Sequence, residues 1–402
     1  MGEKRSLSIW EAIDQVCQHA SLTETITLPV MDTLHYILAE NVYTKINQPP
    51  FPRSAMDGYA IKASDSYGAS FQHPVTLEVV GCQYAGDAYF RELKSGEALR
   101  IMTGAAIPKG ADAVIRQEDS NYGQEQVELY ATVKPWENYC EIGEDFPEGD
   151  LLAEAGETVD AYLISAAVAA GIRELKLHRR VKAAVITTGD ELQDPGTPLT
   201  EGKIYNSNLA LFVTRLRQLG CEVKMAVAAG DQLPVIMNAM KTAAKDCDLI
   251  ITTGGVSVGM KDLLPQAMEE LGAEIIFHGI SIKPGMPTMF SLYHKIPILS
   301  LSGNPYSAAA VFELIVQPLL KEMTGRRKEV LKRVCGLSED SFPKKTGCTR
   351  FLRGYYEEGR ISFAKGQRNG QTKAGIGANC LICLEAGRKP VDPGEELQAY
   401  LI

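Results

Sequence analysis

The pattern of apolar and polar positions changes several times along the chain. Residues 8–20 carry apolar side chains at helical spacing, with Ser8 placed as the N-cap and Glu11 at the capping-box position. Residues 48–52 contain three prolines, which no regular element tolerates, so we expect a linker there. Between residue 55 and about residue 147, short alternating runs separated by Gly and Pro predict a small β-rich domain.

A strand-and-helix alternation begins near residue 181. Strands are expected at 181–189, 222–228, 249–253, 274–277 and 297–301, and helices at 208–219, 234–244, 263–271 and 306–323. This βαβ alternation is typical of a doubly wound sheet with helices on both faces, so we expect a three-layer α/β domain. After residue 328 the chain returns to short strands, including a hairpin of 353–356 with 361–363, and the spacing predicts a small barrel or sandwich.

The expected fold class is therefore α/β and multidomain, with two β-rich domains beside the doubly wound one. Residues 1–45 and 147–179 are expected to form a discontinuous helical and extended unit, into which a β-rich domain of residues 46–146 is inserted. Residues 180–327 form the α/β domain, and residues 328–402 a barrel-like C-terminal domain.

Composition and charge narrow the class of protein. The 402 residues carry 41 Lys and Arg against 50 Asp and Glu, so the net charge of −9 disfavours nucleic-acid binding. Any anionic ligand must therefore be bound by positive charges gathered at its own site. Nine irregularly spaced cysteines do not suit a disulfide framework in so long a chain, which favours a reducing, cytoplasmic compartment. The longest nearly apolar stretch, residues 161–172, suits a buried helix rather than a membrane span, and no apolar signal-peptide region follows the N-terminus.

Candidate chemistry gathers where the predicted parallel strands end, because ligands of open α/β sheets bind beyond the carboxyl ends of the strands. Glycines and carboxylates recur there, in Thr188-Gly189-Asp190-Glu191, Gly230-Asp231, residues 252–262 and Ser302-Gly303-Asn304-Pro305. The loop of residues 254–259 would let backbone N–H groups approach a phosphate. It is not a Walker A loop, because Met260 precedes Lys261 and Asp262 stands where Ser or Thr is needed. A plain turn between strand and helix explains this loop equally well.

Carboxylates beside a phosphate repel it unless a divalent cation lies between them, so Glu191, Asp231 and Asp262 together suggest bound Mg²⁺. Asp231 and Asp262 could instead be helix N-caps, which is the commoner role of a lone Asp at a helix start. Lys283, in Lys283-Pro284-Gly285, would add a fixed cation for an oxyanion, or be an ordinary solvated lysine.

Other candidate positions have simpler explanations. Asp57, before Gly58, is a turn signal first and a catalytic carboxylate second, and Thr103 could simply end a strand. Cys380 and Cys383 resemble half a zinc site, but no second pair exists, so we interpret them as core residues. The six histidines lack ligand spacing, which makes a histidine metal site improbable.

Seven motifs in chain order resemble the molybdopterin molybdenumtransferase (MoeA) family, which is related to the C-terminal domain of gephyrin. They are residues 49–60, residues 100–105 with Pro108, Gly110, Asp112 and Glu118, Gly143-Glu144-Asp145, residues 188–192, residues 253–259 with Asp262, Lys283-Pro284-Gly285 and Gly303-Asn304-Pro305. The resemblance spans essentially the whole chain. Each motif is weak alone, and the ordered set is specific.

The resemblance implies an enzyme that inserts molybdate into adenylylated molybdopterin and releases AMP with the help of Mg²⁺. It implies catalytic roles for Asp57, Thr103, Asp145, Glu191, Asp231 and Asp262, with Glu191 and Asp231 as metal ligands. It implies substrate contacts for Thr188, Gly189, Asp190, Thr253, Gly254, Gly255, Ser257, Gly259, Lys283, Pro284, Gly303, Asn304, Pro305, Ser307, Arg350 and Arg353. Among these, Lys283, Ser307 and Arg353 match the positions expected to contact molybdate or the pterin phosphate, and Arg350 is a further candidate for that contact.

The resemblance also implies an elongated homodimer, with residues 1–45 and 147–179 as the dimerisation domain and each active site shared between subunits. Functional partners would be a molybdopterin adenylyltransferase and proteins that mature molybdoenzymes, with no nucleic acid or membrane involved. The sequence departs from the family at Ser302, Met286 and Ala374, which leaves open whether molybdate or tungstate is preferred. The alternatives are a gephyrin-like scaffold, a tungstate-preferring paralogue, or an adenylyltransferase, which would lack the β module that carries Asp57 and Thr103.

Overall fold

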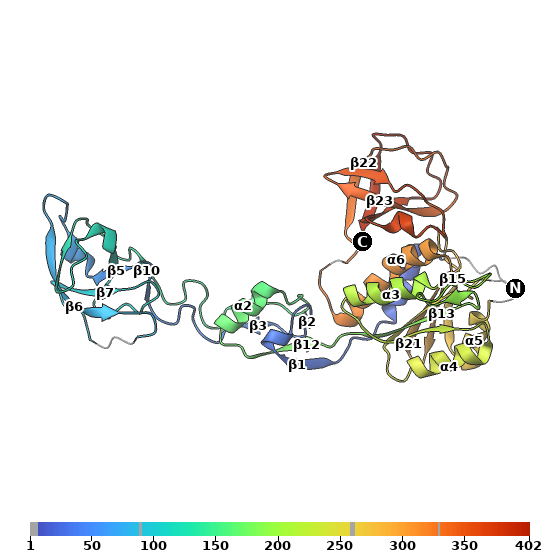
Figure 1. The fold of residues 1–402 in the computed structure, drawn as a ribbon, viewed down its shortest axis with the longest axis horizontal. Coiled ribbons are helices and arrows are strands. Elements are labelled where there is room, and N and C mark those ends of the chain that lie inside the picture. Colours follow the sequence, from blue (N-terminus) through green and yellow to red (C-terminus); the bar gives the residue numbers. More distant parts are fainter. Residues whose placement is uncertain (1–6, 88–90, 258–261, 329) are drawn as a thin grey trace.

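The computed structural model describes residues 7–87, 91–257, 262–328 and 330–402 (Figure 1). The chain forms an elongated molecule. The inserted β-rich domain lies at one end, the α/β domain with the C-terminal barrel lies at the other, and a small connecting unit lies between them. The mixed α/β multidomain class expected from the sequence is confirmed.

The α/β domain is built on a six-stranded sheet with the order β16-β13-β17-β21-β20-β18. Its strands are β13 (Lys182–Thr188), β16 (Glu222–Ala229), β17 (Leu249–Thr253), β18 (Glu274–His278), β20 (Met289–Tyr293) and β21 (Ile296–Leu301). Its helices are α3 (Ser207–Gln218), α4 (Leu233–Ala243), α5 (Leu264–Leu271) and α6 (Pro305–Thr324). Side chains of α3 and α6 share one apolar core with the sheet, and those of α4 and α5 share another, so helices cover both faces.

One strand of this sheet differs from the expectation. Strand β20 runs antiparallel between β21 and β18, whereas the sequence indicated no strand there. It forms a hairpin with β21 through His294 and Lys295, both with positive φ angles (52° and 68°). Because these residues are neither Gly nor Asn, the turn lacks the usual hairpin signature, which is why it was missed.

Helix α1 (Ile9–Gln18) begins with the expected capping box: the backbone N–H of Glu11 donates to Ser8 Oγ, and the backbone N–H of Ser8 donates to Glu11 Oε2. Its buried face joins the core formed by α3 and α6. The helix therefore packs with the α/β domain, although the division expected from the sequence places it in the unit of residues 1–45 and 147–179.

The C-terminal domain is a small closed barrel. Its strands are β22 (Arg333–Ser338), β23 (Thr349–Glu357), β24 (Arg360–Phe363), β25 (Cys380–Leu384) and β26 (Glu396–Leu401), and pairing of β23 with β25 closes the sheet. The predicted hairpin is present, with Glu358 and Gly359 in its turn. Cys380 and Cys383 are buried in the barrel strand β25, as expected for core residues.

The inserted domain carries a five-stranded sheet with the order β8-β5-β7-β6-β9. Its strands are β5 (Gly58–Ile61), β6 (Val75–Gln83), β7 (Glu97–Ile101), β8 (Ala113–Arg116) and β9 (Gln126–Leu129). The proline-rich residues 48–52 lead into this domain beside the segment by which the chain leaves it, and Gln48 pairs there with Phe146. The expected linker is therefore one half of a two-stranded connection, which also contains the short pair β4 (Arg53–Ser54) and β10 (Tyr139–Cys140).

The connecting unit contains the sheet β1-β12-β2 and the helix α2. Its elements are β1 (Thr25–Pro29), β2 (Ile37–Leu38), β3 (Val42–Tyr43), β11 (Leu151–Ala153), α2 (Ala161–Ala169) and β12 (Glu174–His178). The expectation of a buried helix at 161–172 is only half right. Tyr162 is 86% exposed, because this small unit covers one face of α2. No helix in the described part of the chain is both long and apolar enough to cross a membrane.

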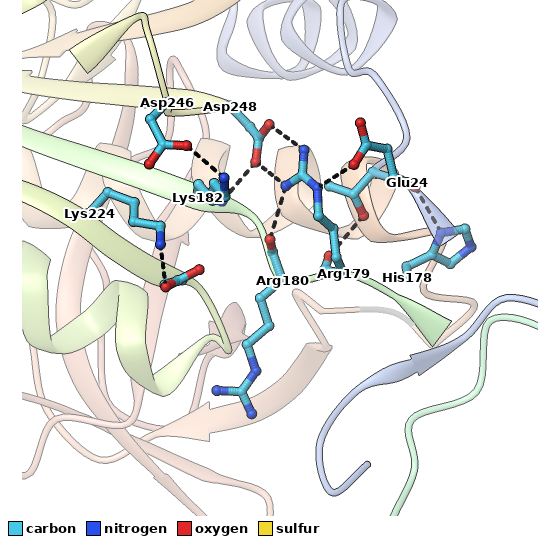
Figure 2. Close-up of polar contacts among 10 residues, drawn as sticks. Glu24, His178, Arg179, Arg180, Lys182, Lys224, Asp246 and Asp248 are labelled. Atoms are coloured by element: carbon cyan, nitrogen blue, oxygen red, sulfur yellow. Dashed lines mark hydrogen bonds and ion pairs between the residues drawn. The ribbon is translucent and has the colours of Figure 1, made fainter. Parts of the chain in front are cut away.

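A polar joint connects this unit to the α/β domain (Figure 2). Arg179, just after β12, donates from Nη1 and Nη2 to the carboxylate of Asp248 over 2.6 and 2.8 Å, and from Nε to Glu24 over 3.3 Å. The same carboxylate accepts the backbone N–H of Lys182 at the start of β13. Charged hydrogen bonds with paired donors fix geometry as well as energy, so Arg179 sets how the connecting unit meets the sheet.

Candidate functional site

A cavity of about 320 Å³, named here the oxyanion pocket, lies between the α/β domain and the barrel. The two domains are joined there by the short strand β19 (Ile282–Lys283), which pairs with β23 so that Lys283 lies opposite Arg350. Its lining also includes Ser302, Asn304, Ser307, Gln367 and Asn369. Two cations and several neutral polar groups therefore line one cavity, as an oxyanion requires.

Tight packing shapes the loop that carries Lys283. Gly285 has φ = 107°, and a Cβ at this position would approach Cγ2 of Val311 to 2.3 Å. Only glycine therefore lets the loop lie this close to α6. Met286, which departs from the family pattern, lines the pocket and is largely exposed. Ser302 is buried, and its Oγ accepts the backbone N–H of Asn304.

Glycine turns lie at the carboxyl edge of the sheet, as predicted. Gly254 has φ = 91°, and a Cβ there would lie 2.4 Å from the carbonyl oxygen of Thr188. A Cβ on Gly303 would lie 3.5 Å from the Cα of Gly254, so the turns after β17 and β21 touch. Asn208 fastens them from α3, donating from Nδ2 to the carbonyl of Gly303 over 2.9 Å and to Thr253 Oγ1 over 3.3 Å. Because Ser302 and Asn304 line the oxyanion pocket, the strand-end turns and this pocket adjoin.

The predicted magnesium carboxylates do not form a metal site by themselves. Asp190 and Asp231 each accept the other's backbone N–H, over 3.0 and 3.3 Å, and the carboxylate of Glu191 lies over Gly189. Among the described residues, no group of three or more His, Cys, Asp or Glu is placed to hold a metal ion. Mg²⁺ prefers about six oxygen ligands, so these side chains do not fit a magnesium site made by the protein alone.

The helix-cap explanation for two of these carboxylates is wrong. The N-cap of α4 is Gln232 and that of α5 is Leu263, so neither Asp231 nor Asp262 caps a helix. Asp262 is half-buried just before α5, and Ser257 is exposed. Gly259 lies outside the described residues.

Asp57 and Thr103 form a compact pair in the inserted domain. The backbone N–H and Oγ1 of Thr103 both donate to Oδ1 of Asp57, each over 2.7 Å. These bonds, the side-chain one first, lower the pKa of Asp57 below its usual value. The pair forms because Gly58 in β5 lies opposite Ile101 in β7, so that the residues flanking both strands meet.

The structure separates these residues from the strand-end group within one chain. The inserted domain and the α/β domain lie at opposite ends of the molecule (Figure 1). Asp145 is in neither place: it is exposed in the two-stranded connection, where its backbone N–H donates to the carbonyl of Gln48. The predicted site residues therefore form three groups in a single chain.

Arg353 lines a neighbouring cavity rather than the oxyanion pocket, together with Asn208 and Tyr306. Its guanidinium donates to backbone carbonyls of the loop that follows β24, and its Nε is buried without a hydrogen-bond partner in the described part of the chain. Arg350, three residues earlier on β23, does line the pocket. The resemblance assigned both arginines to substrate; each lines a cavity, and Tyr306 lines both cavities.

Three polar residues at or near the candidate site were not predicted from the sequence. Gln367 and Asn369 line the oxyanion pocket from a loop without periodicity, so the pattern offered no signal for them. Lys203 was also missed, although its Nζ donates to the carbonyl of Asp190 at the strand edge. It follows Gly202 in a polar stretch without distinctive spacing, and only the pairing of β14 (Leu192–Gln193) with β15 (Ile204–Tyr205) brings it there.

Comparisons with known proteins cover nearly the whole chain. Residues 7–171 match the MoeA N-terminal region (domain I and II), residues 184–322 match a probable molybdopterin binding domain, and residues 337–402 match the MoeA C-terminal region (domain IV). The chain is 36% identical over 380 residues to the molybdopterin molybdenumtransferase of Haemophilus influenzae, with 93% of both proteins covered. It is 33% identical over 414 residues to that of Bacillus subtilis, covering 100% of this chain and 96% of the relative.

Comparison with solved structures points to the same family. A molybdopterin biosynthesis MoeA protein from Pyrococcus horikoshii superposes with a TM-score of 0.85 at 30% identity, covering 99% of both chains. A second structure of that name and source gives a TM-score of 0.83 at 27% identity, covering 99% of this chain and 100% of the other.

Proposed function

The chain belongs to the molybdopterin molybdenumtransferase (MoeA) family, enzymes of molybdenum cofactor biosynthesis, and on that premise we propose that it inserts molybdate into adenylylated molybdopterin and releases AMP. The observation that carries the proposal is the oxyanion pocket, in which Lys283 and Arg350 lie on paired strands beside the glycine turns of the sheet edge. Molybdate is a tetrahedral dianion, and two cations with hydroxyl and amide groups match its charge and its acceptors.

The strand-end turns suit the phosphate part of the substrate. Gly254 and Gly303 let the substrate approach the backbone without Cβ obstruction, next to the N-terminus of α6, whose dipole favours negative charge. A substrate spanning these turns and the pocket would bring its dithiolene to the oxyanion. Two S–H groups and molybdate would then form two Mo–S bonds and release one oxygen as water, while one water molecule cleaves the phosphoanhydride to free AMP.

Asp57 is the proposed general base for that water. Thr103 donates only to Oδ1, which holds the carboxylate in place and leaves its second oxygen to accept a proton. Because one chain holds Asp57 far from its own oxyanion pocket, we propose a homodimer in which the partner's inserted domain completes the site. The exposed face of α2 in the connecting unit supports an assembly through that unit. Mg²⁺ would have to gain ligands from the substrate phosphates, so no step here depends on a protein-only metal site.

The decisive experiment supplies the purified chain with adenylylated molybdopterin, Mg²⁺ and molybdate and measures AMP release. We expect molybdate-dependent release, with Asp57→Ala and Glu191→Ala slower by about 10²-fold or more, as for loss of general-base chemistry or its electrostatic support. Arg360→Lys on the exposed surface of the barrel is the matched control and should behave like the parent. Absent AMP release from the parent, or equal rates for the parent and both alanine variants, would refute the catalytic proposal and favour a scaffold.

A further inference from the structure

His278 lies at the carboxyl end of the edge strand β18, where the chain turns toward the oxyanion pocket. It pairs with Met289 of β20. The backbone N–H of the next residue, Gly279, donates to the carbonyl of Thr288 over 2.8 Å and closes the base of the segment that carries Lys283. The sheet therefore fixes the position from which the imidazole of His278 reaches its neighbours.

That imidazole binds the backbone of the glycine loop, residues 254–257, which follows β17. Its Nε2 lies 2.8 Å from the carbonyl oxygen of Val256, in a partly buried place. Because a carbonyl oxygen only accepts hydrogen bonds, Nε2 carries the hydrogen and donates it. The side chain of Val256 is 1% exposed and packs in the core shared with α4 and α5. Both the side chain and the carbonyl of Val256 are therefore held.

The peptides before Val256 are held by the sheet and by α5. The N–H of Gly254 donates to the carbonyl of Leu301 over 3.1 Å, and the carbonyl of Gly255 accepts the N–H of Leu264 over 3.1 Å. Two successive carbonyls of the glycine loop are thus engaged. The helix binds the first and His278 binds the second.

These two bonds also set the direction of two N–H groups. Both peptides are trans, so the C=O and N–H of each point in opposite directions. The N–H of Val256 therefore points away from α5, and that of Ser257 points away from His278. Neither N–H has an acceptor in the parts of the chain that the structure describes. Successive free N–H groups suit an anionic oxygen, and the contact of Gly254 with Gly303 places them at the sheet edge.

We propose that His278 is a positioning residue for the substrate phosphate: its bond to Val256 holds the following peptide so that the N–H of Ser257 faces the phosphoanhydride. His278 acts through the backbone of the glycine loop. The inference rests on the proposed function for its substrate readouts, and on the contacts alone for its loop readout.

The test separates the hydrogen bond of His278 from the volume of its ring in the full-length protein. His278→Phe keeps a ring but has no donor, whereas His278→Gln keeps an N–H donor and has no ring. His278→Phe should raise the Kd for AMP and the KM for adenylylated molybdopterin about tenfold, the equivalent of one hydrogen bond to a charged group. His278→Gln should recover most of both losses. The KM for molybdate should stay within about twofold of the parent in both variants, because Lys283 and Arg350 are untouched.

Amide hydrogen exchange reports on the loop without substrate. The N–H of Leu264 is protected by the carbonyl of Gly255, one peptide before the anchored one. It should exchange about tenfold faster in His278→Phe and close to the parental rate in His278→Gln, because the unanchored loop opens more often.

The matched controls are His73→Phe and His73→Gln, at an exposed histidine of the inserted domain whose described hydrogen bonds involve only its backbone. They should change none of these values. Thermal midpoints within a few degrees of the parent show that the variants are folded. Should His278→Phe fail to fold, His278→Leu repeats the donor-free arm.

Three results would overturn the proposal: parental AMP affinity in a folded donor-free variant, equal losses in the donor-free variant and His278→Gln, or an unchanged exchange rate of Leu264 without the donor. If the parent released no AMP from adenylylated molybdopterin, the proposed function would fail separately. Titration with AMP and hydrogen exchange would then still decide the role of His278.

Discussion

At the scale of single residues, the site depends on how a few polar side chains are held. Asp57 has two donors from one residue, Thr103, both on the same oxygen. This arrangement fixes the carboxylate without burying it and leaves its second oxygen for a water molecule. The lowered pKa follows from donors that stabilise the charged form, and not from a neighbouring cation, since the contribution of Arg100 is the smallest.

A substitution of Thr103 tests this link between geometry and ionisation. Thr103→Val removes the Oγ1 donor, which is the larger cause of the lowered pKa, so the pKa of Asp57 should rise toward its usual value. A base with a depressed pKa is active above that pKa and loses activity as the pH falls through it. The acidic limb of the rate–pH profile should therefore move to higher pH, while Thr103→Ser stays close to the parent. An unshifted limb in Thr103→Val would separate Asp57 from the rate-determining ionisation.

At the scale of elements, the carboxyl edge of the sheet is shaped by turns that require glycine. The turn after β17 needs the positive φ of Gly254 and also its lack of a side chain, because the carbonyl of Thr188 lies where a Cβ would be. The turn after β21 then rests directly on it at Gly303. This backbone contact fixes the position of the two strand ends relative to the start of α6 and the oxyanion pocket.

A pair of glycine variants separates backbone strain from steric exclusion. Gly272, the C-cap of α5, has φ = 70° with open space around its Cβ position, so Gly272→Ala should lower the free energy of unfolding by only about 1 kcal/mol. Gly254→Ala adds a backbone collision, and the loss should reach about 2 to 4 kcal/mol, with AMP release impaired. Calorimetric unfolding of both variants checks this, and equal losses would contradict the close contact.

At the scale of the whole molecule, the elongated shape of the chain separates the two ends that carry candidate site residues. The two-stranded connection and the connecting unit hold Asp57 away from the oxyanion pocket of the same chain (Figure 1). The joint of Arg179 with Asp248 and Glu24 sets the direction in which that arm leaves the α/β domain (Figure 2). The proposed site needs both ends, so on that proposal it would be assembled from two chains.

Mixing two inactive variants tests this shared site. Asp57→Ala and Lys283→Ala would each disable one half, and mixed dimers would contain one intact and one doubly altered site. Unfolding and refolding the two together should restore roughly a quarter of the parental AMP release, because half of the dimers are mixed and each has one working site. The separately refolded variants provide the baseline. No recovery despite demonstrated mixed dimers would place both residues in the site of a single chain.

Particular residues show how far sequence reasoning reached. Strand and helix periodicity located β17 at its observed bounds and α3, α4, α5 and α6 to within a residue. It missed β20, because His294 and Lys295 form a turn without the usual residues. The resemblance named Lys283 and Arg350, which the structure places on paired strands, and Arg353, which lines a neighbouring cavity. Gln367 and Asn369 were out of reach, because an irregular loop is positioned by contacts distant in sequence.

The elements, the α/β class, the barrel-like domain and the glycine turns could be predicted from the sequence, because periodicity, capping and backbone freedom are local properties of the chain. Which charged groups share a cavity depends on long-range pairing, since β19 of one domain pairs with β23 of another. The fold also packs α1 on the α/β domain and places the inserted domain, which carries Asp57, at the far end of the molecule. Local patterns carry no information on these long-range contacts, so the candidate site became visible only when the domains were placed in space.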